Sequence, residues 1–145
     1  MRSQHAIAGS FLSPLHAILL AFPVALYPSA LASDITYYRT AEVQWSNFSS
    51  WLITGADLFA GLLLAWAVVS FFFGRVGVVR SRGLLYLALV AVMFVLGVVN
   101  AFQHAKDGWH SVGTLGIVLS VLCSILALVI AFLAHSSLFV RDKAA

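Results

Sequence analysis

The chain has 145 residues, of which 62% are hydrophobic and only 9% are charged. Soluble domains are about 45–50% apolar and about 25% charged, so a water-soluble fold of this length could not bury so much apolar surface. The formal net charge of +3 comes mainly from basic residues at the ends of apolar segments, a pattern that offers no nucleic-acid-binding face and is typical of a membrane protein.

The first apolar segment covers residues 15–33 and is long enough to span a bilayer. Pro14 suits the first turn of a helix, and Ser13 is a plausible N-cap. Pro23 and Pro28 are expected to bend this helix, because each removes a backbone donor. Small residues recur every four positions and predict a stripe that another helix approaches closely: Ala17, Ala21, Ala25 and Ser29.

The same segment also imitates a cleavable signal peptide, with Arg2 before the apolar run and Ala30-Leu31-Ala32 before Ser33. We expect it to be retained instead. The run is longer than most signal-peptide cores, and it supplies His16 and the small-residue stripe that the bundle is expected to need.

Residues 34–49 are polar with interspersed aromatic side chains, including Tyr37, Tyr38 and Trp45. Tyrosine and tryptophan prefer the headgroup level of a bilayer. We therefore expect a short interfacial helix or loop after the first span.

The second span is expected at 50–73, and it is followed by a loop with three arginines and no acidic residue: Arg75, Arg80 and Arg82. Such a loop is typical of the cytoplasmic side. The third and fourth spans are expected at 84–103 and 111–134. Together these segments predict a single transmembrane domain over residues 1–145, an all-α up-down-up-down bundle of four helices with both termini in the cytoplasm.

Four short motifs carry a resemblance: Ser-Pro-Leu-His-Ala at 13–17, Ala-Phe-Pro-Val-Ala at 21–25, Ser-Asp-Ile-Thr-Tyr at 33–37 and His-Ala-Lys-Asp-Gly-Trp at 104–109. With them the chain resembles a bacterial family of four-helix inner-membrane proteins that is catalogued as a domain of unknown function. Members are often encoded beside sorbosone-dehydrogenase-like enzymes. The resemblance implies the pattern positions His16, Pro23, Asp34, His104 and Asp107. The chain departs from the family pattern at Ser13, where a histidine is common, and at Ser70, where an acid is common.

Asp57 is the one charged residue inside the second span, where a carboxylate is costly unless it is neutralised, paired or hydrated. Counting depth from the outer face predicts that Asp57 meets Asn100 of the third span. A protonated Asp57 that is hydrogen-bonded to Asn100 would be structural, whereas a proton-accepting or quinone-contacting Asp57 would be functional.

A polar cluster between the last two spans contains His104, Asp107 and His110, which are expected to form an outward-facing site. These side chains could shuttle protons, or they could simply close the helix and its turn. Their spacing matches no metal signature, and we predict no metal site.

His16 and His135 are expected at similar depth near the cytoplasmic face. Paired histidines on facing helices can hold haem, although histidines are also ordinary at an interface. Cys123 lies inside the last span and is interpreted as a core residue. Two further sets of small residues predict helix contacts rather than chemistry: Ala56 and Ala60, and Gly116, Ser120 and Ser124.

The sequence has no nucleophile elbow, phosphate-binding loop or dinucleotide motif, so no catalytic residues are predicted. The leading hypothesis is a non-enzymatic inner-membrane subunit that anchors or assists a periplasmic or membrane partner, such as a dehydrogenase. One alternative is a redox subunit that binds haem b or quinone, and another is a small proton or solute transporter.

Overall fold

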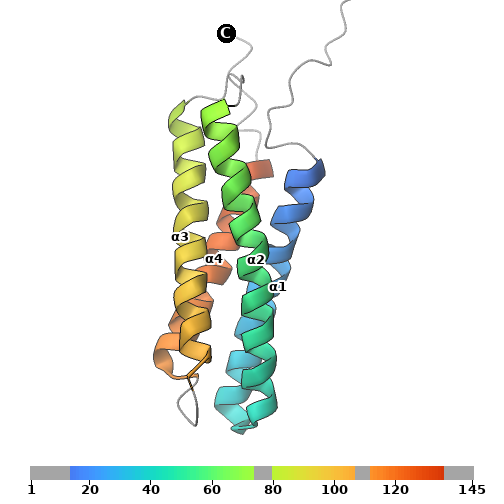
Figure 1. Ribbon diagram of the computed structural model, residues 1–145. Helices are drawn as coiled ribbons and strands as arrows, with labels where there is room; N and C mark the ends of the chain where they lie inside the picture. The colour runs from blue at the N-terminus through green and yellow to red at the C-terminus, as the bar shows by residue number, and fades with distance from the viewer. Residues whose placement is uncertain (1–13, 74–79, 107–111, 136–145) are drawn as a thin grey trace, which may run out of the picture.

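Four α-helices make up the part of the chain that this computed structural model describes, which covers residues 14–73, 80–106 and 112–135. Helix α1 is Pro14–Thr40, α2 is Val43–Phe73, α3 is Arg80–His104 and α4 is Thr114–His135 (Figure 1). All four contain a stretch that is long and apolar enough to cross a membrane. The all-α membrane architecture expected from composition is confirmed.

The sequence predicted a separate interfacial segment over residues 34–49, but these residues belong mainly to α1 and α2. α1 continues to Thr40 and α2 already begins at Val43, so the two helices are joined by two residues. The side chains of Ser and Thr on α1 bond to carbonyl groups four residues earlier and so need no other partner: Ser29 to Ala25, Ser33 to Ser29, Thr36 to Ala32 and Thr40 to Thr36. The polar composition of this segment is thus compatible with a continuous helix.

The residue that follows α1 has a left-handed backbone conformation. Ala41 has a φ angle of 55°, and its N–H donates to the carbonyl oxygen of Tyr37 at 2.7 Å, which closes the last turn. The N–H of Glu42 then donates to Thr40 Oγ1 at 3.4 Å, and Trp45 N–H donates to the Glu42 carbonyl at 3.0 Å as α2 begins. These bonds explain how a two-residue connection reverses the chain.

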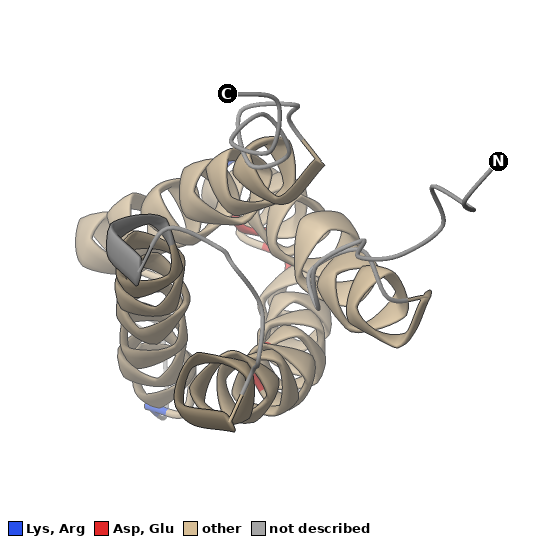
Figure 2. Ribbon diagram, turned by 90° about the horizontal axis from the view of Figure 1, so that it is seen from above, with Lys and Arg blue, Asp and Glu red and all other residues tan. Residues whose placement is uncertain are grey.

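The helices pack as a ring in which α1 lies beside α2 and α4, and α3 lies beside α2 and α4 (Figure 2). α1 and α3 are therefore diagonal to each other. In Figure 1, α1 and α3 descend through the view while α2 and α4 ascend, and the joined ends of α1 and α2 reach below the end of α3. The orientation of this ring across the membrane stays a prediction, because Arg75 lies outside the described residues and the side chains of Arg80 and Arg82 do too.

Large apolar side chains cover much of the outside of the bundle, as a lipid-facing surface requires. Examples on α2, α3 and α4 are Leu58, Phe73, Val95, Phe102, Ile125 and Phe132. The interior contains a cluster of apolar residues with exposures of a few per cent at most, to which all four helices contribute: Leu20, Tyr27, Leu63, Val90, Met93, Cys123 and Ile130.

The predicted small-residue contacts have two outcomes. Ala56 and Ala60 on α2 and Gly116, Ser120 and Ser124 on α4 are buried between helices, so these two sets do lie at helix contacts. The α1 stripe instead faces out of the bundle, since Ala17, Ala21, Ala25 and Ser29 are exposed. The residues of α1 that face inward are mostly larger and recur with a spacing of three or four, and Ser33 is buried beside them: His16, Leu20, Pro23, Tyr27, Ala30, Asp34 and Tyr37.

Candidate functional site

An aspartate and a histidine meet inside the bundle, near the end where α1 joins α2. Asp34 Oδ1 on α1 lies 2.8 Å from His104 Nε2 on α3, and both side chains have no exposed surface. The contact runs diagonally across the ring, between two helices that are not neighbours. A buried pair of this kind persists only if each member compensates the charge of the other.

The hydrogen bonds of His104 fix how many protons the pair holds. His104 Nδ1 lies 2.9 Å from the carbonyl oxygen of Asn100, which can only accept, so Nδ1 carries a hydrogen. The other ring nitrogen and Asp34 Oδ1 then share one proton. Whether it resides on the imidazole or on the carboxyl, the pair has no net charge, which is the arrangement that costs least inside a membrane.

The second oxygen of Asp34 is held by α4. Ser120 Oγ donates to Asp34 Oδ2 at 2.5 Å, and Asn100 Nδ2 on α3 donates to Ser120 Oγ at 2.9 Å. Asn100 thus donates to Ser120, which in turn donates to Asp34, and each hydrogen bond of such a chain polarises and strengthens the next. Asn100 is fully buried, and its Oδ1 has no hydrogen-bond partner among the described residues.

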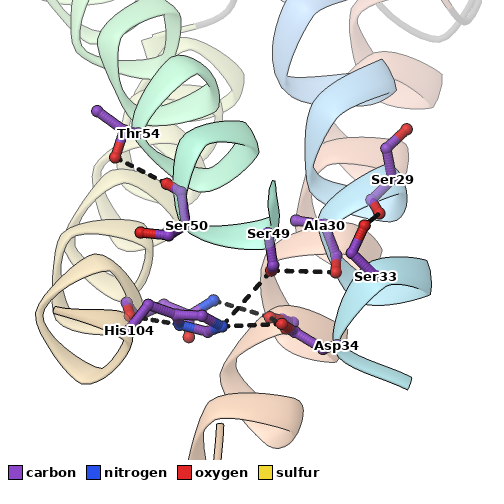
Figure 3. A network of polar contacts seen from close by, with 10 residues as sticks. Ser29, Ala30, Ser33, Asp34, Ser49, Ser50, Thr54 and His104 are labelled. Atoms are coloured by element: carbon purple, nitrogen blue, oxygen red, sulfur yellow. Dashed lines mark hydrogen bonds and ion pairs between the residues drawn. The ribbon is translucent and has the colours of Figure 1, made fainter. Parts of the chain in front are cut away.

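α2 completes the network through Ser49, which is buried. Its hydroxyl donates to the carbonyl oxygen of Ala30 on α1 at 3.2 Å and also lies 3.5 Å from His104 Nε2 (Figure 3). In Figure 3, Asp34 and His104 point towards each other with Ser49 directly beside them. All four helices therefore contribute a polar side chain to one buried network.

A second polar site lies deeper in the bundle around Asp57 of α2. Tyr27 on α1 donates its hydroxyl to Asp57 Oδ1 at 2.6 Å. The space for this pair is provided by Gly97 on α3, because a Cβ atom at that position would overlap both the Asp57 carboxyl and the Tyr27 hydroxyl. This site therefore combines residues of α1, α2 and α3.

The inward position of Asp57 agrees with the interpretation of the sequence, but its partner differs. Asp57 is 9% exposed and bonds to Tyr27, whereas the amide of Asn100 bonds to Ser120. Asn100 lies one turn from Gly97, the residue of α3 that faces Asp57, so the predicted depth of Asp57 was within about one turn of its position. The hydroxyl of Tyr27 reaches the carboxyl in the space that the missing side chain of Gly97 leaves.

His104, the one member of the predicted outward-facing site that the structure describes, lies inside the bundle. It is 6% exposed, and its imidazole is directed into the bundle by Asp34. Asp107 and His110, the other two members of the predicted site, lie outside the described residues. Sequence reasoning gave Asp34 no part in any site, although it lies seven residues after Tyr27 and so on the same helical face.

The two histidines considered as haem ligands have separate partners. His16 is buried, and its Nε2 lies 2.7 Å from the hydroxyl of Tyr86 on α3. His135 is exposed, and its Nδ1 donates to the carbonyl of Ala131 on its own helix at 2.9 Å. Among the described residues, no group of three or more His, Cys, Asp or Glu side chains is placed to hold a metal ion.

The pattern positions implied by the resemblance gather in the interior: His16, Pro23, Asp34 and His104 are all buried. A family described as "Predicted membrane protein (DUF2231)" matches residues 12–138, which is most of the chain. The chain belongs to the DUF2231 family. Comparison with curated proteins and with solved structures gave no match. Membership in DUF2231 supports the membrane architecture, and the chemistry has to be argued from the residues.

Proposed function

We propose that this DUF2231 protein is an accessory subunit of the bacterial inner membrane, with both termini in the cytoplasm, that docks against a transmembrane helix of a different membrane protein. The observation that carries the proposal is the outward-facing stripe of small residues on α1. Lipid chains fill any surface and need no small residues, whereas a close contact between two helices does.

The stripe distinguishes α1 from the outer faces of its neighbours. Ala17, Ala21, Ala25 and Ser29 continue over about three turns of exposed helix, and the Ser29 hydroxyl is already bonded to the Ala25 carbonyl, so the stripe presents no unpaired polar group to lipid. The connection between α1 and α2 is two residues long, which leaves little structure outside the membrane at that turn. Contact within the bilayer is therefore the mode of association that the described residues favour. The family resemblance implies a periplasmic or membrane partner such as a dehydrogenase.

The docking face can be tested by making it bulky. Ala21→Leu and Ala25→Leu, introduced together, should release the protein from a larger complex when native membranes are extracted in mild detergent and run on a native gel. The matched control is Ala65→Leu with Ala88→Leu, which together add the same bulk at exposed positions of α2 and α3. We expect the wild-type protein and the control to migrate with the complex and the double variant to migrate alone.

Three results would count against the proposal. These are equal migration of the double variant and the control, a wild-type protein that is monomeric in its own membrane, and a complex that contains only copies of this chain. An absorption spectrum of the purified protein tests the redox alternative at the same time, since a Soret band would favour bound haem over a purely accessory role.

A further inference from the structure

Buried groups with exchangeable protons occur at three levels along the inward face of α1. His16 bonds to Tyr86, Tyr27 bonds to Asp57, and Asp34 bonds to His104. At about 1.5 Å of rise per residue, Tyr27 lies about 10 Å from Asp34 and about 16 Å from His16 along the helix. The three levels are thus unequally spaced.

The shorter interval is lined with polar groups. Ser120 and Asn100 continue from Asp34 in a chain of hydrogen bonds of 2.5 Å and 2.9 Å. Asn100 is one turn from Gly97, the residue whose missing side chain makes room for the Asp57 carboxyl. The buried Asn100 Oδ1 has no hydrogen-bond partner among the described residues, so an acceptor is available in the interval where a water molecule would need one.

The longer interval is apolar. Between the Tyr27 and His16 levels the interior is filled by side chains that cannot carry a proton, all of them almost completely buried: Leu20, Pro23, Leu63, Val90 and Met93. A proton that reaches Asp57 from one end of the bundle therefore meets an apolar barrier before His16. Next to Asp57, the described interior is polar towards Asp34 and apolar towards the His16–Tyr86 pair.

The polar side begins close to the end of the membrane-spanning part. His104 is the last residue of α3, while α1 and α2 continue beyond this level to Thr40 and from Val43. The His104 imidazole itself is fully buried, and the hydroxyl of Ser49 lies 3.5 Å from its Nε2.

The geometry points to a proton-loading site at Asp57 that is filled from the α1–α2 end of the bundle through Asp34–His104, Ser120 and Asn100. The ligand is a proton. The buried groups of the interior that can titrate come from every helix: His16, Tyr27, Asp34 and Tyr37 on α1, Asp57 on α2, Tyr86 and His104 on α3, and Cys123 on α4. This inference is independent of the accessory role, which rests on the outer face of α1.

Each transfer conserves atoms. The proton shared by His104 Nε2 and Asp34 Oδ1 moves onto the Asp34 carboxyl, and the Ser49 hydroxyl, 3.5 Å from Nε2, takes up an aqueous proton and passes its own to the imidazole. The Asp34 carboxyl group then rotates so that this proton faces Ser120. The Ser120 hydroxyl turns, accepts the proton and releases its own to a water held by Asn100 Oδ1, which delivers one proton to Asp57. Asn100 orients the water and carries no proton itself. Asp57 ends as a neutral carboxylic acid, the form of a carboxyl group that costs least in lipid.

Infrared spectroscopy of the protein in lipid nanodiscs tests this route, because a protonated carboxyl has its own C=O band that shifts on transfer to D₂O. Asp57→Asn assigns the band of Asp57. Ser120→Ala should slow the deuterium exchange of that band by about tenfold or more, since one proton carrier is removed. The matched control is Ser124→Ala, one turn away on α4, whose hydroxyl bonds to the Ser120 carbonyl of its own helix.

Ser120→Thr keeps the hydroxyl and should restore exchange towards the wild-type rate, which separates proton transfer from packing. Ser120→Ala exchanging as fast as Ser124→Ala would overturn the route, as would equal slowing in Ser120→Ala and Ser120→Thr. The absence of an exchangeable Asp57 band from the wild-type protein would overturn the loading site itself. Migration on native gels does not enter this test, so the accessory role and the proton site can fail separately.

Discussion

The two halves of the bundle are held together in different ways. On the side of the α1–α2 connection, Asp34, Ser49, Asn100, His104 and Ser120 link all four helices by hydrogen bonds. On the other side, the described interior contacts are mainly apolar, and the hydrogen bond between His16 and Tyr86 lies near the end of that half. The Tyr27–Asp57 pair lies at the boundary between the halves.

This difference shows what can specify an arrangement of helices in lipid. Apolar side chains gain little by leaving lipid for a protein interior, because both surroundings are apolar. Packing alone therefore discriminates weakly between one rotation of a helix and another. A buried Asp–His pair does discriminate, since a rotated helix would leave a charge without its partner. We infer that the polar half fixes the register of the helices and that the apolar half follows it.

Breaking the Asp34–His104 pair should have the largest effect on stability. Asp34→Leu leaves the imidazole without its counter-charge and should lower the free energy of unfolding by about 3–5 kcal/mol. The double variant Asp34→Leu with His104→Leu removes both charges and should recover much of that loss. Unfolding in mixed micelles with increasing denaturing detergent measures all three proteins. A double variant that is less stable than Asp34→Leu would show that the two residues do not act as a pair.

Filling the space at Gly97 should have the next largest effect. In Gly97→Ala the new methyl group overlaps the Asp57 carboxyl and the Tyr27 hydroxyl, so their hydrogen bond must lengthen or α3 must move. A loss of about 1–3 kcal/mol is expected from overpacking of this kind. Gly113→Ala is the control, because a Cβ there meets nothing within 4 Å. The same unfolding assay should separate the two, and equal losses would contradict the role assigned to Gly97.

A conservative change in the apolar half should have the smallest effect. Met93 is fully buried among apolar side chains, and Met93→Leu keeps nearly the same volume and removes no hydrogen bond. We expect a change in unfolding free energy of less than about 1.5 kcal/mol. If Met93→Leu lowered the free energy of unfolding as much as Asp34→Leu, the inference that the polar half fixes the register of the helices would be wrong.

The sequence by itself determined the class of the protein and the number of helices. Apolar segments of about 20 residues can satisfy their backbone in lipid only as helices, so composition and length were enough to predict four spans. The same reasoning predicted that Asp57 turns inward, because a charge is costly against lipid. It also predicted that small residues of α2 and α4 lie at helix contacts. These inferences needed only local information and the properties of the bilayer.

The tertiary structure alone decided the partners. Asp34 lies 70 positions before His104 and 86 before Ser120, and no local pattern reports such pairings. The sequence also could not show that α1 continues through the polar stretch after residue 33 or that its small-residue stripe faces outward. Both depend on how α1 is rotated against the other three helices. That rotation places Asp34 opposite His104. At another rotation of α1, the Asp34 carboxyl would not reach the His104 imidazole.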